Sequence, residues 1–424
     1  MDEPNESSRV IEHAARTSYG RLVAFLARRT RDIAAAEDAL ADAFAAALRT
    51  WPTSGVPERP EAWLLAAAGN RLLDQQRRAD TARRHGPDLA SATAPREPDP
   101  MESAATSLLG MPDERLHMLF ACAHPAIDAA MHTPLMLQAV LGLEANKIAA
   151  AFIVSPTAMA QRLVRAKGKI RDAGISFDLP PREQLGERLD AVLDAIYAAF
   201  GSGWDDVAGA DAASRGLADE AVFLGRMLVD LMPDQPEPLG LLALMLYCQA
   251  RRAARAAGTG FTPLDQQDAS RWSRPLLAEA ESLLRRASEQ RQFGRFQIEA
   301  AIQSAHVDGA LRGQTDWPAI VRLYDGLLAI APTLGAAVGR AAAIAEAQGP
   351  SAGLSALDAI DAHASLHADM ATYQPAWALR AHLLAMLGAS DAAARAYERA
   401  IGLCEDDSVR RFLLGRLAAV QSTS

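Results

Sequence analysis

The residues of this chain best suited to chemistry form a basic run in its middle. Between Gln161 and Arg171 there are five arginines and lysines and no acid, and lysine occurs in the chain only at positions 147, 167 and 169. A helix with this surface suits the phosphates of a DNA duplex, and its guanidinium and amide groups can bind base edges in the major groove. The outward residues that could read DNA are Thr157, Gln161, Arg162, Arg165 and Lys169.

Two helical patterns joined by a tight turn position this run within residues 142–171. Ser155 is the predicted N-cap of the second helix, and Pro156 suits its first position. The predicted buried face of the first helix is made of Leu143, Ile148, Ala149 and Phe152. In the second helix Met159, Leu163, Ala166 and Ile170 recur at helical spacing, which leaves Thr157, Gln161, Arg162, Arg165 and Lys169 outward. The pattern predicts a helix-turn-helix, although packed helices with a solvated charged face remain the alternative.

A second group of polar residues precedes this region. An apolar stripe predicts a helix with one buried face, made of Ile33, Leu40, Phe44, Ala47 and Trp51. Beside it lies an acidic patch of Glu37, Asp38 and Asp42. The next helix is expected to begin at Pro60 and to bury Trp63, Leu64 and Ala67. Its polar stripe consists of Asn70, Arg71, Asp74, Arg77 and Arg78, which in an isolated helix is more often only a solvated face.

The composition predicts a soluble, almost wholly α-helical protein. Half of the 424 residues are hydrophobic, Ala and Leu dominate, and alternating β-branched or aromatic residues are nearly absent. The net charge of −9 is uneven, because residues 1–178 hold 21 basic and 22 acidic side chains while 179–424 hold 22 and 30. Three widely separated cysteines favour a reducing cytoplasm, and no apolar run reaches the length of a membrane span.

Glycine and proline residues mark boundaries that divide the chain into four segments. Residues 1–85 and 112–175 are predicted helical domains, joined by a proline-rich flexible linker at 86–111. Residues 182–424 are predicted to form stacked helix pairs, because positions from Trp377 to Ala400 follow a tetratricopeptide rhythm and Trp317 to Gln348 is a looser copy. Such an array has a concave surface that often takes a peptide or protein partner, the alternative being a helical stabilising domain without a ligand.

The order of these segments resembles a known family. The runs AEDALADAFAAALRTWP and RPEAWLLAAAGNRLLDQQRR, followed by a proline-rich linker and a helix-turn-helix, are similar to extracytoplasmic-function (group IV) sigma factors of the bacterial sigma-70 family. FACAHPAI, QRLVRAKGKIRDAGI and LGRMLVDLMPDQPEPLGLLALML resemble the subgroup with a C-terminal tetratricopeptide-like domain. The resemblance covers nearly the whole chain and implies two small helical sigma domains, a tether and a helical-repeat tail.

The resemblance also implies partners and site residues. Core RNA polymerase, through its β′ and β subunits, and promoter DNA are the implied partners. The residues that match the segment docking on the β′ clamp helices are Glu37, Asp38, Asp42 and Phe44. Those that match the reader of the minus-ten element are Asn70, Arg71, Asp74, Arg77 and Arg78. The residues that match the helix binding the minus-thirty-five element are Ser155, Thr157, Gln161, Arg162 and Arg165. Lys167 and Lys169, together with Arg165, are expected to contact phosphates there.

Some features depart from the family pattern or exclude other chemistry. Relatives commonly place an Ala-Arg pair where this chain has Ala68 and Gly69, so one basic contact is missing. His117, Cys122 and His124 lack the spacing and fourth partner of a zinc site, and Cys122 is interpreted as a packing residue. No phosphate loop or catalytic motif is present, so neither an enzyme nor a cofactor is expected.

Two other functions stay open on the sequence alone. A helix-turn-helix regulator that acts without polymerase would use the acidic helix around Asp38 only as structure. A tetratricopeptide scaffold with decayed sigma domains would start no promoter-specific transcription, and Gly69 gives this alternative some weight.

Overall fold

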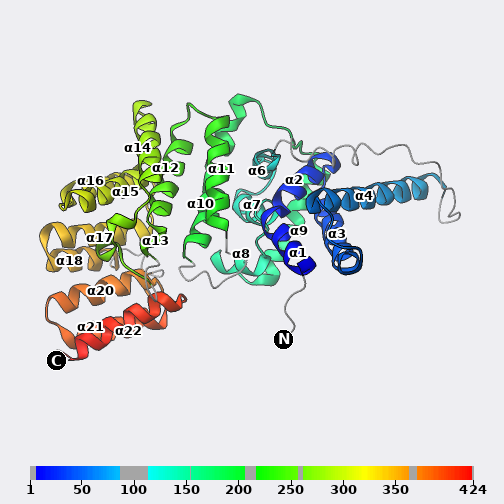
Figure 1. The fold of residues 1–424 in the computed structure, drawn as a ribbon. Helices are drawn as coiled ribbons and strands as arrows, with labels where there is room; N and C mark the ends of the chain where they lie inside the picture. The colour runs from blue at the N-terminus through cyan, green and yellow to red at the C-terminus, as the bar shows by residue number, and fades with distance from the viewer. Residues whose placement is uncertain are drawn as a thin grey trace. The chain divides into compact units, whose positions relative to one another are not determined.

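The structure, a computed structural model, describes residues 6–85, 113–152, 154–205, 216–255, 261–361 and 370–422. Every regular element in these ranges is helical (Figure 1), as the composition predicts. The chain divides into two compact units, Met1–Ala199 and Phe200–Ser424. The first unit therefore extends past the boundary expected at 182, and α10 (Arg182–Asp205) contains the division. The predicted linker at 86–111 lies outside the described residues.

The N-terminal half of the first unit contains α1 (Glu6–Thr17), α2 (Tyr19–Thr30), α3 (Ile33–Ser54) and α4 (Pro60–His85). Helix α3 begins where Asp32 accepts a hydrogen bond from the Ala35 amide. Its predicted stripe is confirmed at Ile33, Leu40, Ala47 and Trp51, which are at most 2% exposed, whereas Phe44 is half-buried.

Helix α4 begins at Pro60 as predicted, but its buried face is turned relative to the expectation. Leu64 is buried as expected, and Leu65, Ala68 and Leu72 are the other buried hydrophobic residues of this helix. Trp63, expected to be buried, is half-buried, as is Ala67. The Trp63 and Trp51 rings meet edge to face, with centroids 5.4 Å apart. Helix α4 packs mainly on α3 and also contacts α1 and α2.

The second half of the first unit contains α6 (Arg115–Cys122), η2 (Ala129–Met131), α7 (His132–Ala139), α8 (Ala145–Ala151) and α9 (Pro156–Asp172). Helices α8 and α9 pack against each other across a short turn. The predicted buried face of α9 is confirmed at Met159, Leu163, Ala166 and Ile170. In α8 only Ile148 and Ala149 are fully buried. Phe152, expected inside, is 38% exposed because it caps the end of α8, where the chain turns away.

The second unit is a succession of packed helices. After α10 come α11 (Leu217–Leu231), α12 (Pro236–Ala250), α13 (Arg252–Arg255), η3 (Leu264–Gln266), η4 (Ala269–Arg271), α14 (Arg274–Glu289), α15 (Arg295–Arg312), α16 (Trp317–Ile330), α17 (Leu334–Gln348), α18 (Pro350–Asp361), α20 (Gln374–Met386), α21 (Ser390–Gly402) and α22 (Asp407–Ser422). Helix α12 is almost entirely apolar and packs on both α14 and α15.

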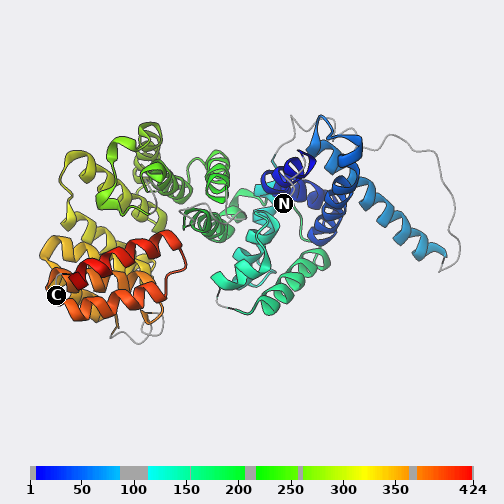
Figure 2. The same ribbon diagram turned by 60° about the horizontal axis from the view of Figure 1, so that its bottom comes forward.

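The segments with a repeat pattern form helix pairs. Trp317 to Gln348 becomes α16 and α17, which share a core around Ile320. The segment around Tyr397 becomes α20 and α21, and Tyr397, Ala400 and the partly buried Trp377 pack in one cluster. Figure 2 shows α20 to α22, in orange to red, lying beside one another. Small residues such as Ala381 and Ala400 line these contacts and allow the helices to approach closely.

Candidate nucleic-acid interface

Helix α9 presents the polar face that its sequence predicts. Ser155 caps it by accepting a hydrogen bond from the Ala158 amide at 3.2 Å. The exposed residues of this face include the predicted Thr157, Gln161, Arg162, Arg165 and Lys169. The guanidinium of Arg165 donates to the carbonyl of Gln161, which aligns it along the helix.

The same face holds two features that the sequence patterns did not identify. Val164 is 70% exposed in the middle of the polar residues, although its type would suit a core. An open cavity of about 480 Å³ lies between α9 and η2, and Ile127 and Met131 form its apolar wall while Arg162, Arg165 and Lys169 supply cations. The exposure of Val164 could have been predicted from the sequence, because position 164 does not fall among the regularly spaced buried positions of α9. The cavity depends on contacts between separate elements, which no local pattern contains.

Lys167 does not lie on this exposed face. It is 8% exposed, and its ammonium lies 2.5 Å from a carboxylate oxygen of Glu37 on α3. Position 167 is four residues after Leu163 and falls within the buried register, which directs its side chain towards α3. Lys167 was not among the residues predicted to point outward, but it was expected to contact a DNA phosphate, and in this arrangement its ammonium pairs with Glu37 instead.

The acidic patch of α3 is only partly open. The Glu37 side chain is 17% exposed, and burial raises the pKa of its carboxylate above the ordinary value while Lys167 opposes part of that rise. Asp42 is about half exposed and accepts from Arg71 at 2.8 Å. Asp38 is exposed and Phe44 is half-buried. Of the acids expected to meet polymerase, Asp38 therefore offers the most accessible charge.

Helix α4 carries the other predicted set. Arg71, Asp74, Arg77 and Arg78 are exposed on it, and Asn70 is half-buried. Because they recur at three- and four-residue spacing, they form one stripe along the helix. The Asp42 pair holds Arg71 towards α3. The stripe is a cationic surface with a single acid, a composition suited to a nucleic-acid backbone.

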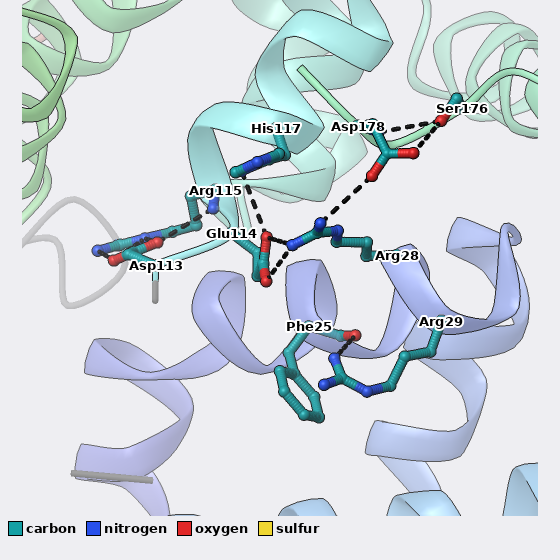
Figure 3. A network of polar contacts seen from close by, with 9 residues as sticks. All are labelled: Phe25, Arg28, Arg29, Asp113, Glu114, Arg115, His117, Ser176 and Asp178. Atoms are coloured by element: carbon teal, nitrogen blue, oxygen red, sulfur yellow. Dashed lines mark hydrogen bonds and ion pairs between the residues drawn. The ribbon is translucent and has the colours of Figure 1, made fainter. Parts of the chain in front are cut away.

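A network of charges joins α2 to the start of α6 (Figure 3). Both carboxylate oxygens of Glu114 accept from the Arg28 guanidinium, at 2.5 and 2.6 Å, and Glu114 is only 5% exposed. Arg28 also donates a hydrogen bond to Asp178 at 3.2 Å. The hydrogen bond to Glu114, and to a lesser extent that to Asp178, raises the pKa of Arg28. His117 lies 3.3 Å from Glu114, and burial lowers its pKa. Arg28, Glu114 and Asp178 are far apart in sequence, so no local pattern predicted their contacts.

Other reactive groups offer little chemistry. Cys122 is fully buried, and burial raises the pKa of its thiol to about 12, which keeps it protonated and fits a packing role. Within the described residues, no three His, Cys, Asp or Glu side chains gather in a way that could hold a metal ion. The helices in those same ranges include none that is both long and apolar enough to cross a membrane.

Comparisons with known proteins agree with part of this arrangement. Residues 15–82 match sigma-70 region 2, and residues 188–288 match a family of unknown function, DUF6596. A Rhizobium meliloti (strain 1021) protein described as Uncharacterized protein R00370 is 36% identical over 405 residues, covering 94% of this chain and 93% of its own. No solved structure matches. The region 2 match includes α2, α3 and most of α4, and it supports a sigma-70 family sigma factor that binds core RNA polymerase and promoter DNA.

Proposed function

We propose that this chain, which belongs to the same family as the Rhizobium meliloti protein and carries a sigma-70 region 2 domain, is an alternative sigma factor of the extracytoplasmic-function group. It binds core polymerase, recognises two promoter elements and starts transcription. The observation that carries the proposal is the pairing, in one compact unit, of a region 2 domain with a second helical domain whose α9 has a basic exposed face.

The acidic face of α3 is the proposed docking surface for polymerase. Asp38 and Asp42 are exposed acids on successive turns of α3, and the Phe44 ring on the same helix is incompletely buried. Carboxylates in such a row suit a basic helical surface, since charge complementarity directs encounter and orientation. The partner surface we propose is the clamp helices of the polymerase β′ subunit.

Two helices divide the work on DNA in this proposal. The stripe of α4 holds the minus-ten element, where arginines bind the backbone and the half-buried Asn70 borders the site for an unpaired base. The exposed face of α9 enters the major groove at the minus-thirty-five element, where Gln161 and Arg162 read base edges and Arg165 and Lys169 bind phosphates. Neither helix needs to bind tightly alone, because polymerase holds both domains at one promoter.

The second unit is the proposed regulatory part. Its paired helices, such as α16 with α17 and α20 with α21, support a tetratricopeptide-like array. Such arrays present a surface to a peptide or protein partner. We propose that this unit regulates or supports the transcriptional activity of the first.

The test is run-off transcription with purified core bacterial polymerase on a promoter library, with wild-type chain and two charge reversals. Asp38→Arg alters the docking face, while Glu187→Arg alters an exposed acid of α10 and serves as the control. We expect start sites that depend on the added chain. We also expect Asp38→Arg to lower core affinity about tenfold or more, because reversal replaces an attraction by a repulsion. Glu187→Arg should match the wild type.

Each outcome has a direct meaning. Core binding and chain-dependent start sites that Asp38→Arg weakens support the proposal. DNA binding without core binding would instead favour the polymerase-independent regulator. If neither polymerase nor DNA binds, the sigma role is wrong and the scaffold alternative remains.

A further inference from the structure

The turn between α14 and α15 carries an aromatic side chain that is open to solvent. Phe293 is 69% exposed, and within the described residues of the second unit no other large hydrophobic side chain is exposed as much. Phe296, three residues later, is buried in the core. Single exposed apolar residues are common on protein surfaces, so the meaning of Phe293 depends on what surrounds it.

Hydrogen bonds hold the turn in the shape that exposes this ring. The carboxylate of Glu237 on α12 accepts hydrogen bonds from two backbone amides at the start of α15, at 2.9 and 3.2 Å. The side-chain amide of Gln297 donates to the same carboxylate at 3.1 Å and to the carbonyl of Gln292 at 2.6 Å. Gly294 leaves room for Glu237, because a Cβ at that position would lie 2.2 Å from the Glu237 Cδ. The backbone on both sides of Phe293 is therefore fixed, and a ligand that binds the ring loses little entropy in ordering the turn.

Arg291 in the same turn has a backbone conformation that glycine adopts more easily. Its φ is +54°, in the left-handed region, and it is the second residue after the end of α14. Glycine is the residue most favoured at such a position, because a side chain adds steric strain there. The arginine therefore does not serve the stability of the turn. What it adds is an exposed guanidinium two residues from Phe293.

The charge around Phe293 is opposite to that of the second unit as a whole. Residues 179–424 hold 22 basic and 30 acidic side chains, whereas residues 285–295 hold four arginines and one glutamate. Arg295 donates to a glutamate of its own helix at 2.8 Å and is partly engaged by it. The three exposed arginines of the turn and of the last turn of α14 are Arg285, Arg286 and Arg291.

We propose that this basic tip, made of Arg285, Arg286, Arg291 and Phe293, binds single-stranded nucleic acid. The phosphate backbone supplies anions for the arginines, and an unpaired base supplies a flat face on which the Phe293 ring stacks. In a duplex the base faces are covered by their neighbours, so the ring has no face to stack on. The proposal goes beyond the proposed function, which gives the second unit a regulatory or supporting role and no contact with nucleic acid.

The first experiment measures binding of the full-length chain to a fluorescent DNA single strand and to the matching duplex by anisotropy. Phe293→Leu keeps an apolar side chain but removes the aromatic face, whereas Phe293→Trp keeps such a face. We expect Phe293→Leu to weaken binding of the single strand about tenfold and to leave duplex binding unchanged, and Phe293→Trp to bind like the wild type. Ile330→Ala is the control, since it alters another exposed apolar residue of the same unit and should change neither affinity.

Arg291→Gly separates nucleic-acid binding from folding. The substitution removes both the charge and the left-handed strain, so the melting temperature should stay the same or rise. The slope of log affinity for the single strand against log salt concentration should nevertheless fall by about 0.7. Arg312→Gln is the matched control, because Arg312 is an exposed arginine of the last turn of α15 and its loss should leave the slope unchanged.

A photocrosslinker locates the contact, which is needed because the proposed surfaces of α4 and α9 also bind DNA. We expect p-benzoylphenylalanine placed at position 293 to crosslink to the single strand on irradiation, and the same group placed at position 330 not to do so. A crosslink at 293 together with the losses in Phe293→Leu and Arg291→Gly supports the proposal.

The other outcomes refute it. If Phe293→Leu binds the strand like the wild type, or if position 293 gives no crosslink, the basic tip is not a nucleic-acid site. Equal losses for single strand and duplex in Phe293→Leu would show that the ring only shapes the turn. If both variants bind the strand normally but weaken run-off transcription, the tip contacts a protein instead. The binding measurements contain no polymerase, so failure of the sigma role would leave this proposal standing, and loss of the tip site would leave the sigma role untouched.

Discussion

The ion pair of Glu37 and Lys167 should control whether α9 stays packed on α3, an arrangement that we call the closed state. Their side chains are 17% and 9% exposed, so water reaches the pair only partly. Lys167→Met keeps the length of the stem but leaves a mostly buried carboxylate without its cation. Breaking a fully buried pair costs about 3–5 kcal/mol, and partial exposure reduces this to about 2 kcal/mol. At 1.4 kcal/mol per factor of ten, closure should weaken about 30-fold.

Both single variants should loosen the packing of α9 on α3. Lys167→Met leaves the Glu37 carboxylate without its cation, and Glu37→Gln leaves the buried Lys167 ammonium without its anion. The double variant restores closure, because replacing both partners of a buried pair by neutral groups is often nearly neutral.

Dyes are attached at the exposed positions Gln76 of α4 and Asn146 of α8, in a chain whose three native cysteines are replaced. Energy transfer between the dyes in the four proteins gives the coupling as a double-mutant cycle. We expect a coupling near 2 kcal/mol. Arg226→Met is the control, since its pair with Glu279 is more than a third exposed on both sides and lies in the second unit. A coupling below about 0.5 kcal/mol, or equal closure in all four proteins, would show that the pair does not hold α9 on α3.

Other predictions concern pH, DNA reading and a helix cap. Burial lowers the pKa of His306 from 6.5 to about 4. The folded state is therefore most stable above pH 6.5 and loses about 2–3 kcal/mol of stability as the pH falls to 4. In thermal melts at pH 7 and pH 4.5, His306→Phe should remove this loss. In a binding selection, Arg162→Ala should change the base preference at the upstream element about 10- to 100-fold. Lys169→Ala should instead weaken binding to all sequences alike, and it should reduce the slope of log affinity against log salt concentration by about 0.9. Ser155→Ala should lower stability to urea by about 1 kcal/mol.

The local features of the fold follow from the sequence. The start of α9 was predictable because Ser155 and Pro156 act on the nearest amides, and its buried face because four apolar residues repeat at helical spacing. The expectation was wrong for Phe152 because periodicity does not show where a short helix ends. It was wrong for Trp63 because the face of α4 is decided by packing on α3 and α2, which a single helical pattern does not contain.

The candidate interface was predictable only in its exposed residues. Arg162, Arg165 and Lys169 share their face through local geometry, so spacing was sufficient to find them. Lys167 and Glu37 are 130 residues apart, and a basic run gives no sign that one of its members is buried. The pair of Arg28 and Glu114 is separated by 86 residues. Contacts of this range depend on the path of the whole chain, and they decide which charges are available to a partner.

The charge balance of the first 178 residues explains why oppositely charged surfaces of the chain can pack against each other. A factor that must offer acids to a basic protein surface and cations to DNA carries two surfaces that are complementary to each other. With 21 basic and 22 acidic side chains, these residues are nearly neutral, so no long-range repulsion keeps the two surfaces apart. The exposed pair of Arg71 and Asp42 is weak by itself, whereas Lys167 and Glu37 exclude most water and hold more firmly. The buried pair of Lys167 and Glu37 therefore contributes more than the exposed pair of Arg71 and Asp42 to holding the neighbouring helices on α3.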